Sequence, residues 1–392
     1  MITTKFQDKE LSLLGFGAMR LPVKEDGSID EVQVKEMTRY ALENGVNYFD
    51  TAWPYHAGES ERVMGKVLSE YPRESYYLAT KYPGHQILST GYNPAEIFEE
   101  QLRKCGVEYF DFYLLHNVYE KSMETYLDPK WNIIEYFKEQ KRLGRIKHLG
   151  FSTHAQVEGL KQFLEICGDD MEFCQIQLNY LDWTLQDAKA KVELLASYNI
   201  PVWVMEPVRG GKLVKLSDEN DMKLKALRPE EEVVAWSFRF LQSIPNVQMI
   251  LSGMSTMQQM VDNIDTFKEK KPLTKEEMDV LLSIADSMKD SVPCTSCRYC
   301  CDGCPMGLNI PLLINVYNEM RVSPSVNSAM VIEFMEEGKK PSACISCGKC
   351  TKICPQNINI PEVLKDLTKR ISKLPKWADI CKEREEASKK NR

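Results

Sequence analysis

Long apolar runs, an excess of positive charge and a glycine-rich nucleotide fingerprint are all missing from this sequence of 392 residues. No stretch approaches the roughly 18 uncharged residues of a membrane span. The N-terminal MITTKFQDKE lacks the apolar core of a signal peptide, so we expect a cytoplasmic protein without a membrane anchor. The net charge of −7 gives no general attraction to nucleic acid. The GFGAMR segment near the N-terminus does not match the pattern G-x-G-x-x-G.

Apolar residues and cysteine, in contrast, are plentiful. A hydrophobic content of 43% beside 27% charged residues is typical of a globular protein. A chain of 392 residues favours two domains. Disulfides do not persist in a reducing cytoplasm. The thirteen cysteines therefore indicate metal or redox chemistry.

Short apolar and β-branched runs alternate with amphipathic stretches through the first 290 residues. The runs predict strands at SLLGFGAM, NYFDTA, YYLATK, FDFYLLH, HLGFS, FCQIQLN, PVWVME and VQMILSG. Stretches between them, such as DEVQVKEMTRYALENG, have apolar residues at helical spacing. Eight strands, each followed by a helix, predict an α/β fold of the (β/α)8 TIM-barrel type. A doubly wound open sheet would alternate in the same way, but it normally carries the missing fingerprint.

Four ionisable side chains are expected at the mouth of this barrel, because TIM-barrel active sites lie at the C-terminal ends of the strands. Asp50, Lys81 and His116 end three successive strands, and Tyr55 lies five residues beyond Asp50. A nearby ammonium stabilises phenolate, so Lys81 is expected to lower the pKa of Tyr55 from about 10. Asp50 would hold the lysine, and His116 would orient a carbonyl oxygen. Each residue alone could be structural, as an ion pair or a buried histidine, but together they favour a proton-transfer site.

These residues lie in motifs that resemble the aldo-keto reductase family over about residues 1–285. The motifs are LGFGAMR, FDTAWPYHAGESE, ATK, YLLH, GFST, QIQLNY, PVRGGKL and SGMSTMQQMVDNI. The resemblance implies a catalytic tetrad in which Tyr55 donates a proton to a carbonyl that is reduced by nicotinamide hydride. Lys81 and Asp50 would tune the phenol, and His116 would orient a small carbonyl or alcohol substrate.

The same resemblance implies that NAD(P)H is the cofactor and indicates which residues hold it. Ser152 and Gln175 match residues that bind the nicotinamide carboxamide. Arg209, Gly210 and Gly211 match the loop over the pyrophosphate, where exposed backbone N–H groups suit an anion.

The cofactor pocket also departs from the family pattern. Met205 stands where an aromatic residue often stacks on the nicotinamide, and Thr153 replaces the usual asparagine, although Asn263 persists. The segment 251–264 contains no lysine or arginine, whereas members that prefer NADPH place basic residues there for the 2′-phosphate. We therefore expect little advantage of NADPH over NADH, with Asp262 accepting hydrogen bonds from the ribose hydroxyls.

Two cysteine runs, CTSCRYCCDGCP and CISCGKCTKICP, each spell C-x2-C-x2-C-x3-C-P. Three thiolates at three-residue intervals bind one [4Fe–4S] cluster, and in two-cluster ferredoxins the fourth cysteine ligates the other cluster. This predicts Cys294, Cys297, Cys300 and Cys354 as the ligands of one cluster, and Cys344, Cys347, Cys350 and Cys304 as those of the other. A structural zinc site uses four ligands and leaves half of these thiols unexplained. Cys301 falls outside the spacing and is expected not to bind iron.

The segment between the cysteine runs predicts an α-helical ferredoxin-like domain. It contains the helix-like stretches LNIPLLINVYNEM and SAMVIEFMEEG, which make it longer than the link of a compact βαβ ferredoxin. NIP follows each cysteine run, at 309–311 and 359–361, and indicates an internal duplication. We expect a barrel over 1–290, a dicluster domain over 291–372 and a charged tail over 373–392.

The two domains imply different electron chemistry. Hydride transfer moves two electrons, whereas each cluster passes one, and a flavin can do both. FMN with its phosphate near Arg209 is therefore the alternative to NAD(P)H. With NAD(P)H, the clusters would exchange electrons with a ferredoxin or another carrier. A third interpretation is an electron-transfer protein whose barrel is only a scaffold, but the four strand-end residues argue against it. The sequence thus predicts an iron–sulfur oxidoreductase of aldo-keto reductase type whose two clusters relay electrons.

Overall fold

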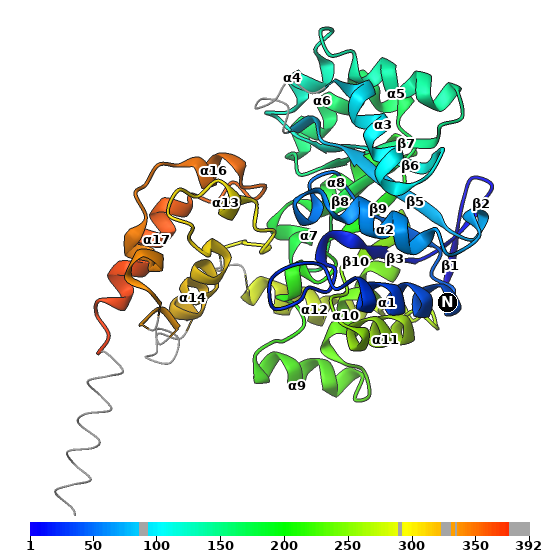
Figure 1. The fold of residues 1–392 in the computed structure, drawn as a ribbon. Helices are drawn as coiled ribbons and strands as arrows, with labels where there is room; N and C mark the ends of the chain where they lie inside the picture. Colours follow the sequence, from blue (N-terminus) through cyan, green and yellow to red (C-terminus); the bar gives the residue numbers. More distant parts are fainter. Residues whose placement is uncertain (86–92, 289–291, 323–330, 334, 376–392) are drawn as a thin grey trace, which may run out of the picture. The chain divides into compact units, whose positions relative to one another are not determined.

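The chain forms two compact units in a computed structural model that describes residues 1–85, 93–288, 292–322, 331–333 and 335–375 (Figure 1). The first unit is Met1–Asp286, and the second comprises the described residues from Ser287 onward. The predicted tail 373–392 lies mostly outside the described residues, and the helix expected within 328–338 lies partly outside them.

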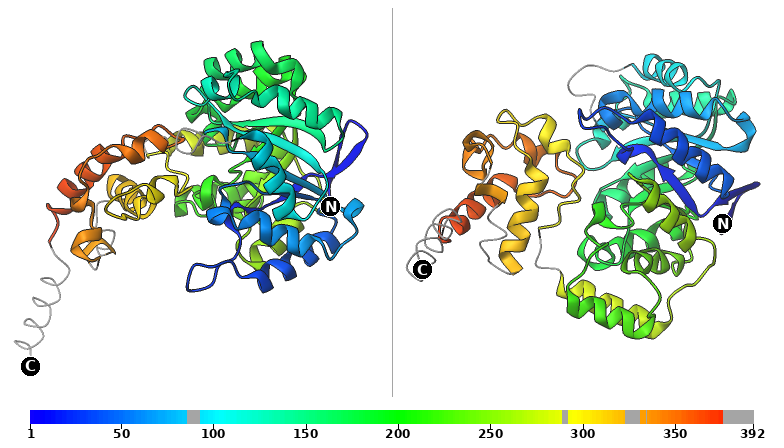
Figure 2. Two further views of the ribbon diagram at one scale, coloured as in Figure 1. Left: turned by 45° about the horizontal axis from the view of Figure 1, so that its top comes forward. Right: turned by 60° about the horizontal axis from the view of Figure 1, so that its bottom comes forward.

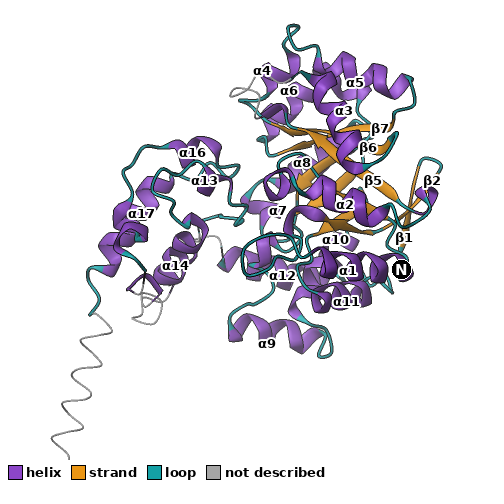
Figure 3. Ribbon diagram, viewed as in Figure 1, coloured by secondary structure: helices purple, strands orange, loops and turns teal. Residues whose placement is uncertain are grey.

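Eight parallel strands close into a barrel in the first unit (Figure 3). The strands are β3 (Leu14–Gly17), β4 (Tyr48–Asp50), β5 (Tyr77–Tyr82), β6 (Phe110–Val118), β7 (Ile146–Thr153), β8 (Cys174–Gln177), β9 (Val202–Met205) and β10 (Val247–Ser252). Sequential strands are neighbours, and β10 closes the barrel by pairing with β3. Each strand coincides with one of the eight predicted runs, which confirms the expected fold.

Helices cover the outer face of the barrel (Figure 2). They are α1 (Glu31–Glu43), α2 (Ser60–Leu68), α3 (Pro94–Cys105), α4 (Met123–Leu127), α5 (Ile133–Arg142), α6 (Val157–Cys167), α7 (Asp182–Leu185), α8 (Ala188–Ser197), α9 (Asp218–Leu227), α10 (Val233–Gln242), α11 (Met257–Thr266) and α12 (Lys275–Ser287). Several helices have a side-chain cap at the N-terminus. The Asp30 carboxylate, for example, accepts a hydrogen bond from the Gln33 N–H at 3.1 Å and caps α1. Within the described residues, no helix is both long and apolar enough to cross a bilayer.

A hairpin that the sequence analysis did not predict packs into the N-terminal end of the barrel. Its strands β1 (Thr3–Phe6) and β2 (Lys9–Ser12) are antiparallel. The Phe6 ring lies 5.1 Å from the Trp203 ring and 5.6 Å from the Phe112 ring, between centroids. Aromatic side chains fill this end of the barrel, whereas the polar residues lie at the opposite, C-terminal strand ends, where the active sites of such barrels are found.

The second unit is an internal duplication with an offset of fifty residues. Helices α13 (Tyr299–Asp302) and α14 (Ile310–Val322) recur as α16 (Lys349–Ile353) and α17 (Ile360–Ile371). The two long helices pack side by side through a core that includes Leu313, Ile314, Leu364 and Leu367. The Tyr317 hydroxyl also donates to the Asp366 carboxylate at 2.9 Å.

The backbone of the two cysteine loops repeats as well. Ser296 and Arg298 have φ of 57° and 70°, and Ser346 and Gly348, fifty residues later, have φ of 55° and 71°. Residues at positive φ alternate here with residues at negative φ. Such a backbone directs successive N–H groups toward one concave side, which can bind an anion, as in many iron–sulfur sites. The two cysteine loops, which have the same cysteine spacing, therefore also have the same backbone conformation.

Candidate functional site

The four strand-end residues predicted as a tetrad converge at the C-terminal mouth of the barrel. The Lys81 ammonium, on β5, donates to the Asp50 carboxylate at the end of β4. It also donates to the Thr51 carbonyl at 2.8 Å and lies 3.3 Å from the Tyr55 hydroxyl. The Tyr55 ring packs edge-on against the His116 ring of β6, with centroids 5.9 Å apart. All four side chains are buried, and Tyr55 is 8% exposed.

Tyr55 enters the site from a tight turn that follows β4. The turn is the short 3-10 segment η2 (Tyr55–Gly58), in which His56 and Ala57 have φ of 51° and 55°. Such values are uncommon for residues other than glycine. With these two residues in the left-handed region, the chain turns sharply directly after Tyr55, whose hydroxyl lies 3.3 Å from the Lys81 ammonium.

Burial dominates the proton affinities of these groups. It raises the pKa of the Tyr55 phenol well above its ordinary value, and the nearby carboxylates Asp50 and Glu206 raise it further. This is the opposite of the sequence-based expectation, because the desolvation of a phenolate outweighs its attraction to one ammonium. Burial also lowers the pKa of Lys81, against the effect of Asp50. The phenol is therefore protonated at neutral pH.

His116 is held as a neutral imidazole. Burial lowers its pKa well below the usual value, with smaller contributions from His85 and Lys81. The His85 ring lies 4.7 Å from the His116 ring, and His85 Nδ1 is 3.1 Å from the His116 carbonyl oxygen. His116 Nδ1 is buried without a hydrogen-bond partner. A neutral ring has one N–H to donate, which suits the orientation of a carbonyl oxygen.

Ser152 and Gln175, expected at the nicotinamide carboxamide, are adjacent in the paired strands β7 and β8. The Ser152 hydroxyl oxygen accepts from the Asn117 N–H at 2.8 Å, so its own proton can be donated elsewhere. The Gln175 side chain is 2% exposed, and its Oε1 is buried without a partner. A carboxamide offers both a donor and an acceptor, and these two side chains fit such a group.

The loop after β9 is supported by a buried ion pair. The loop includes the 3-10 segment η6 (Arg209–Gly211), and Arg209 Nε lies 3.1 Å from both carboxylate oxygens of Asp182. Both side chains are fully buried, and Asn179 donates to Asp182 at 2.7 Å. The Arg209 side chain therefore faces the protein interior. A Cβ added at Gly211 would meet no atom within 4 Å, so its backbone is open on that side.

Glu206 was not among the predicted site residues, yet its carboxylate reaches this loop. Its side chain accepts from the Gly210 N–H, and Arg20 Nη2 lies 3.8 Å from Glu206 Oε1. Glu206 has φ of 58° and directly follows β9. Burial raises its pKa, and Arg20 opposes this effect. The strand-end rule that found Asp50 and Lys81 would also have found Glu206, because it ends the predicted run PVWVME.

The remaining predicted cofactor residues lie at neighbouring strand and helix ends. Met205 ends β9 and is partly buried. Thr153 ends β7, and its hydroxyl donates to the Val118 carbonyl at 2.5 Å. On α11, the buried Asn263 donates to the Ser252 hydroxyl at 3.0 Å. Asn263 thus ties α11 to the end of β10.

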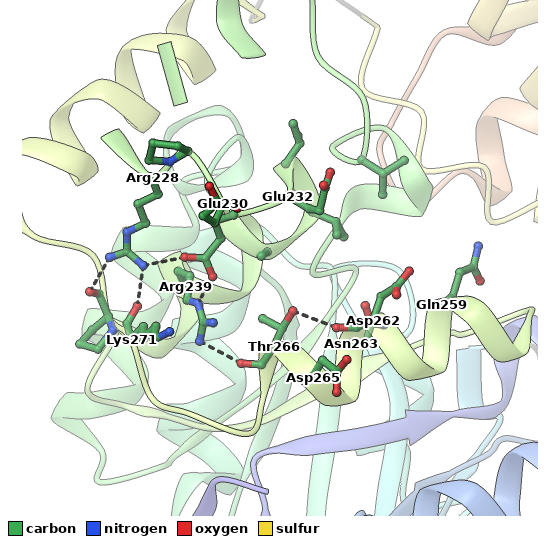
Figure 4. Close-up of a pocket in the computed structure, with 17 residues that line it drawn as sticks. Arg228, Glu230, Glu232, Arg239, Gln259, Asp262, Asn263, Asp265, Thr266 and Lys271 are labelled. Carbon is green, nitrogen blue, oxygen red and sulfur yellow. Dashed lines mark hydrogen bonds and ion pairs between the residues drawn. The ribbon is translucent and has the colours of Figure 1, made fainter. Parts of the chain in front are cut away.

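A broad surface groove borders this face of α11 (Figure 4). Its lining includes the acidic residues Glu230, Glu231, Glu232, Asp262 and Asp265. The three cations of the lining are engaged by carboxylates. Arg228 binds Glu277 and Arg239 binds Glu231, both at 2.6 Å, and Lys271 lies 3.0 Å from Glu269. Of the acidic residues of the lining, Glu231 and Asp265 are paired with cations, and the groove keeps the carboxylates of Glu230, Glu232 and Asp262 as its remaining charges.

In the second unit, the cysteines surround two small pockets. One pocket is lined by Cys294, Cys297, Cys300 and Cys354, and the other by Cys304, Cys344, Cys347 and Cys350. Each set therefore combines three thiols of one run with the last thiol of the other run. Cys301 lines neither pocket. Within the described residues, no three His, Cys, Asp or Glu side chains are placed to hold a single metal ion. Thiols spaced around a pocket fit the separate irons of a cluster.

Comparisons with known proteins identify both parts of the chain. A family model described as the aldo/keto reductase family matches residues 13–286, and one described as a 4Fe-4S dicluster domain matches residues 293–358. The probable aldo-keto reductase 1 of Glycine max is 29% identical over 237 residues, which cover 56% of this chain and 64% of that protein.

Two solved structures share the barrel fold. The holo form of aldo-keto reductase AKR11C1 from Bacillus halodurans has a TM-score of 0.59 at 24% identity and covers 72% of this chain and 96% of its own. An aldo-keto reductase from Klebsiella pneumoniae in complex with NADPH has a TM-score of 0.59 at 17% identity, covering 73% of this chain and 96% of its own. The chain belongs to the aldo/keto reductase family, a family of oxidoreductases, and carries a 4Fe-4S dicluster domain after its barrel.

Proposed function

We propose that the barrel interconverts a small carbonyl compound and its alcohol, with Tyr55 as the proton donor. The observation that carries this proposal is the Lys81 ammonium, which lies between the Asp50 carboxylate and the Tyr55 hydroxyl. When Tyr55 gives its proton to the oxygen of the reduced carbonyl, negative charge develops on the phenol oxygen. The ammonium is already beside that oxygen, so the charge is stabilised without reorganisation.

The other residues of the mouth have supporting roles. His116, as a neutral imidazole, donates a hydrogen bond to the carbonyl oxygen and orients it toward Tyr55. Ser152 and Gln175 offer a donor and an unpartnered acceptor that fit the carboxamide of a nicotinamide. NAD(P)H, when bound, supplies the hydride, and a related barrel from Klebsiella pneumoniae binds NADPH.

FMN is a weaker candidate for this site. A flavin can accept a hydride in the barrel and pass the two electrons on singly to the clusters. Arg209 was expected to pair with its phosphate, but its Nε is paired with Asp182 and the side chain is fully buried. Its Nη1 and Nη2 are buried without a partner, whereas the Glu206 carboxylate engages the Gly210 N–H of the loop and would repel a phosphate there.

We also propose that the second unit binds two [4Fe–4S] clusters, each held by three cysteines of one run and the last cysteine of the other. The two cysteine-lined pockets and the repeated positive-φ backbone support this assignment. The clusters, when bound, supply single-electron transfer to a carrier outside the chain. Free thiols are retained in a reducing compartment, so the cytoplasm remains the proposed location.

Turnover by the anaerobic protein tests the proposed activity. We expect NADH to be oxidised only when a small carbonyl such as methylglyoxal is added, and we expect alcohol to accumulate in equal amount. The measurement is the loss of NADH absorbance together with chromatography of the product. If NADH, NADPH and reduced FMN all failed to reduce a panel of aldehydes and ketones, the scaffold interpretation of the barrel would replace this proposal.

The acidic groove predicts the choice between the two nicotinamide cofactors. One charge-assisted contact to the extra phosphate would be worth about 1.5–3 kcal/mol, or roughly 10- to 150-fold in Kd. Because the cations of the groove are already paired and Asp262 and Asp265 line it, we expect the Kd of NADPH to be no lower than that of NADH. Fluorescence titration of both cofactors measures this ratio. A tenfold or larger preference for NADPH would contradict the charge argument.

Glu206 predicts that cofactor affinity depends on pH. The carboxylate repels a phosphate at the Gly210 N–H, whereas the protonated acid does not. Because the pKa of Glu206 is raised, the neutral form persists to a higher pH than for an ordinary glutamate. We therefore expect the affinity for NADH to fall as pH rises through that pKa. Asp182, Arg20 and Arg209 also act electrostatically on this carboxylate.

Glu206→Gln removes the charge at every pH. We expect this variant to bind NADH more tightly at neutral pH, by roughly tenfold or more, and to lose the pH dependence. Glu165→Gln, an exposed change on α6, is the matched control and should bind like the wild type. Equal slopes of Kd against pH in the wild type and Glu206→Gln would show that Glu206 does not face the cofactor.

A further inference from the structure

The two cysteine runs differ strongly in charge although their backbones repeat. Residues 338–361, which contain the second run, include four lysines and no Asp or Glu. The corresponding residues around the first run, 288–311, contain one lysine, one arginine and two aspartates, which cancel. The whole chain has a net charge of −7. Positive charge is therefore concentrated around one of the two cysteine-lined pockets.

That pocket also reaches the surface. Its lining includes Cys347, which is exposed, and Ile345, which is 60% exposed. Lys349 is exposed as well and lines the same pocket. An isoleucine that remains this exposed beside a cysteine contributes nothing to the core of the unit. Apolar side chains ringed by charge are typical of a surface that binds another protein.

The short helix α16 extends this surface. Lys349, Lys352 and Ile353 are spaced i, i+3 and i+4 and therefore share one side of the helix. Lys352 is exposed, and Ile353 is 46% exposed. Over the part of the chain that the structure describes, neither Lys349 nor Lys352 has an acidic partner. Lys340, in contrast, is paired with Glu337 at 2.6 Å.

We propose that Ile345, Cys347, Lys349, Lys352 and Ile353, the α16 patch, form the docking surface for a small acidic one-electron carrier protein such as a ferredoxin. The proposal rests on the assignment of a cluster to the adjacent pocket. One electron passes between the carrier and that cluster, so one partner is oxidised and the other reduced, and no bond or proton is transferred. The two lysines supply the charge complementarity, and the two isoleucines supply the apolar contact.

The positive charge of the α16 patch suits a transient redox partner. Electron-transfer complexes bury small interfaces, at the low end below about 1,200 Å². Complementary charge speeds their encounter and is screened by salt. Two other occupants would also be acidic: a second copy of this chain, with its net charge of −7, and an acidic surface of the same chain. The experiment below distinguishes them from a carrier protein.

Binding of a gallium-substituted plant-type ferredoxin, which is acidic and redox-inactive, tests the proposal. The full-length protein with intact clusters is measured by biolayer interferometry over a range of salt concentrations. The variant is Lys349→Glu with Lys352→Glu. The control is Lys161→Glu with Lys189→Glu, which makes the same charge change at exposed positions of the barrel, where the side chains are 52% and 59% exposed.

We expect the wild type to bind more weakly as salt rises, and the α16 variant to lose tenfold or more in affinity at low salt. The control should bind like the wild type. Iron content is measured on the same samples; if Lys349→Glu lowered it, Lys349→Gln with Lys352→Gln would replace the variant. Intact iron with unchanged affinity in the variant, salt-independent binding by the wild type, or self-association that the variant abolishes would overturn the docking proposal. Absence of iron from the wild type would instead overturn the cluster assignment.

Discussion

Replacement of Tyr55 by phenylalanine is expected to lower the rate of carbonyl reduction by roughly 10²–10⁴-fold, the usual contribution of a positioned acid. The variant lacks the proton donor but keeps the ring that packs against His116. Cofactor binding should be nearly unchanged, because the hydroxyl is directed toward Lys81 rather than toward Ser152 and Gln175. The measurement is kcat with NADH and a small aldehyde, together with the Kd of NADH.

Tyr48→Phe is the matched control for this prediction. Tyr48 starts β4 in the barrel interior, and its hydroxyl is buried. The same atom is removed, but the Tyr48 ring packs against Phe112 and Trp203 in the aromatic core of the barrel rather than against Lys81 and His116, so turnover should match the wild type. Undiminished carbonyl reduction by Tyr55→Phe would remove the phenol from the chemistry and revive the interpretation of the barrel as a scaffold.

The electrostatic reason for this effect depends on burial that no sequence pattern displays. Asp50, Tyr55, Lys81 and His116 could be predicted as neighbours, because parallel strands bring their C-terminal ends to one edge. The sign of the pKa shift of Tyr55 could not, since it depends on how completely the surrounding side chains exclude water. The attraction of one ammonium alone would lower this pKa, which is the direction expected from the sequence.

Contacts between distant segments account for the other differences. Asp182 and Arg209 are 27 residues apart, and no sequence motif around either residue predicts an ion pair. Their pairing depends on the approach of α7, which follows β8, to η6, which follows β9. The N-terminal hairpin was missed because its strands have four residues each and include few apolar positions. By contrast, the crossed cysteine sets could be proposed from the sequence, because C-x2-C-x2-C-x3-C-P is the pattern of two-cluster ferredoxins, in which the fourth cysteine ligates the other cluster.

The crossed ligand sets lead to an expected pattern of iron loss. The wild type should contain about eight irons, and Cys297→Ala or Cys354→Ala should each retain about four, because each removes a ligand of the same cluster. The double variant Cys297→Ala with Cys354→Ala should also retain about four. Cys347→Ala with Cys354→Ala should retain almost none, because its two changes affect different clusters. Alanine is preferred to serine, whose oxygen can still bind iron.

Iron and acid-labile sulfide analysis of anaerobic protein measures this pattern. Cys301→Ala should keep the full iron content, because Cys301 lines neither pocket, although it lies between the proposed ligands Cys300 and Cys304 in the sequence. If each run instead supplied all four ligands of its own cluster, the two double variants would exchange their iron contents. The comparison of the doubles therefore distinguishes crossed from local ligation, which the single variants cannot do, since every single ligand change removes one cluster under either arrangement.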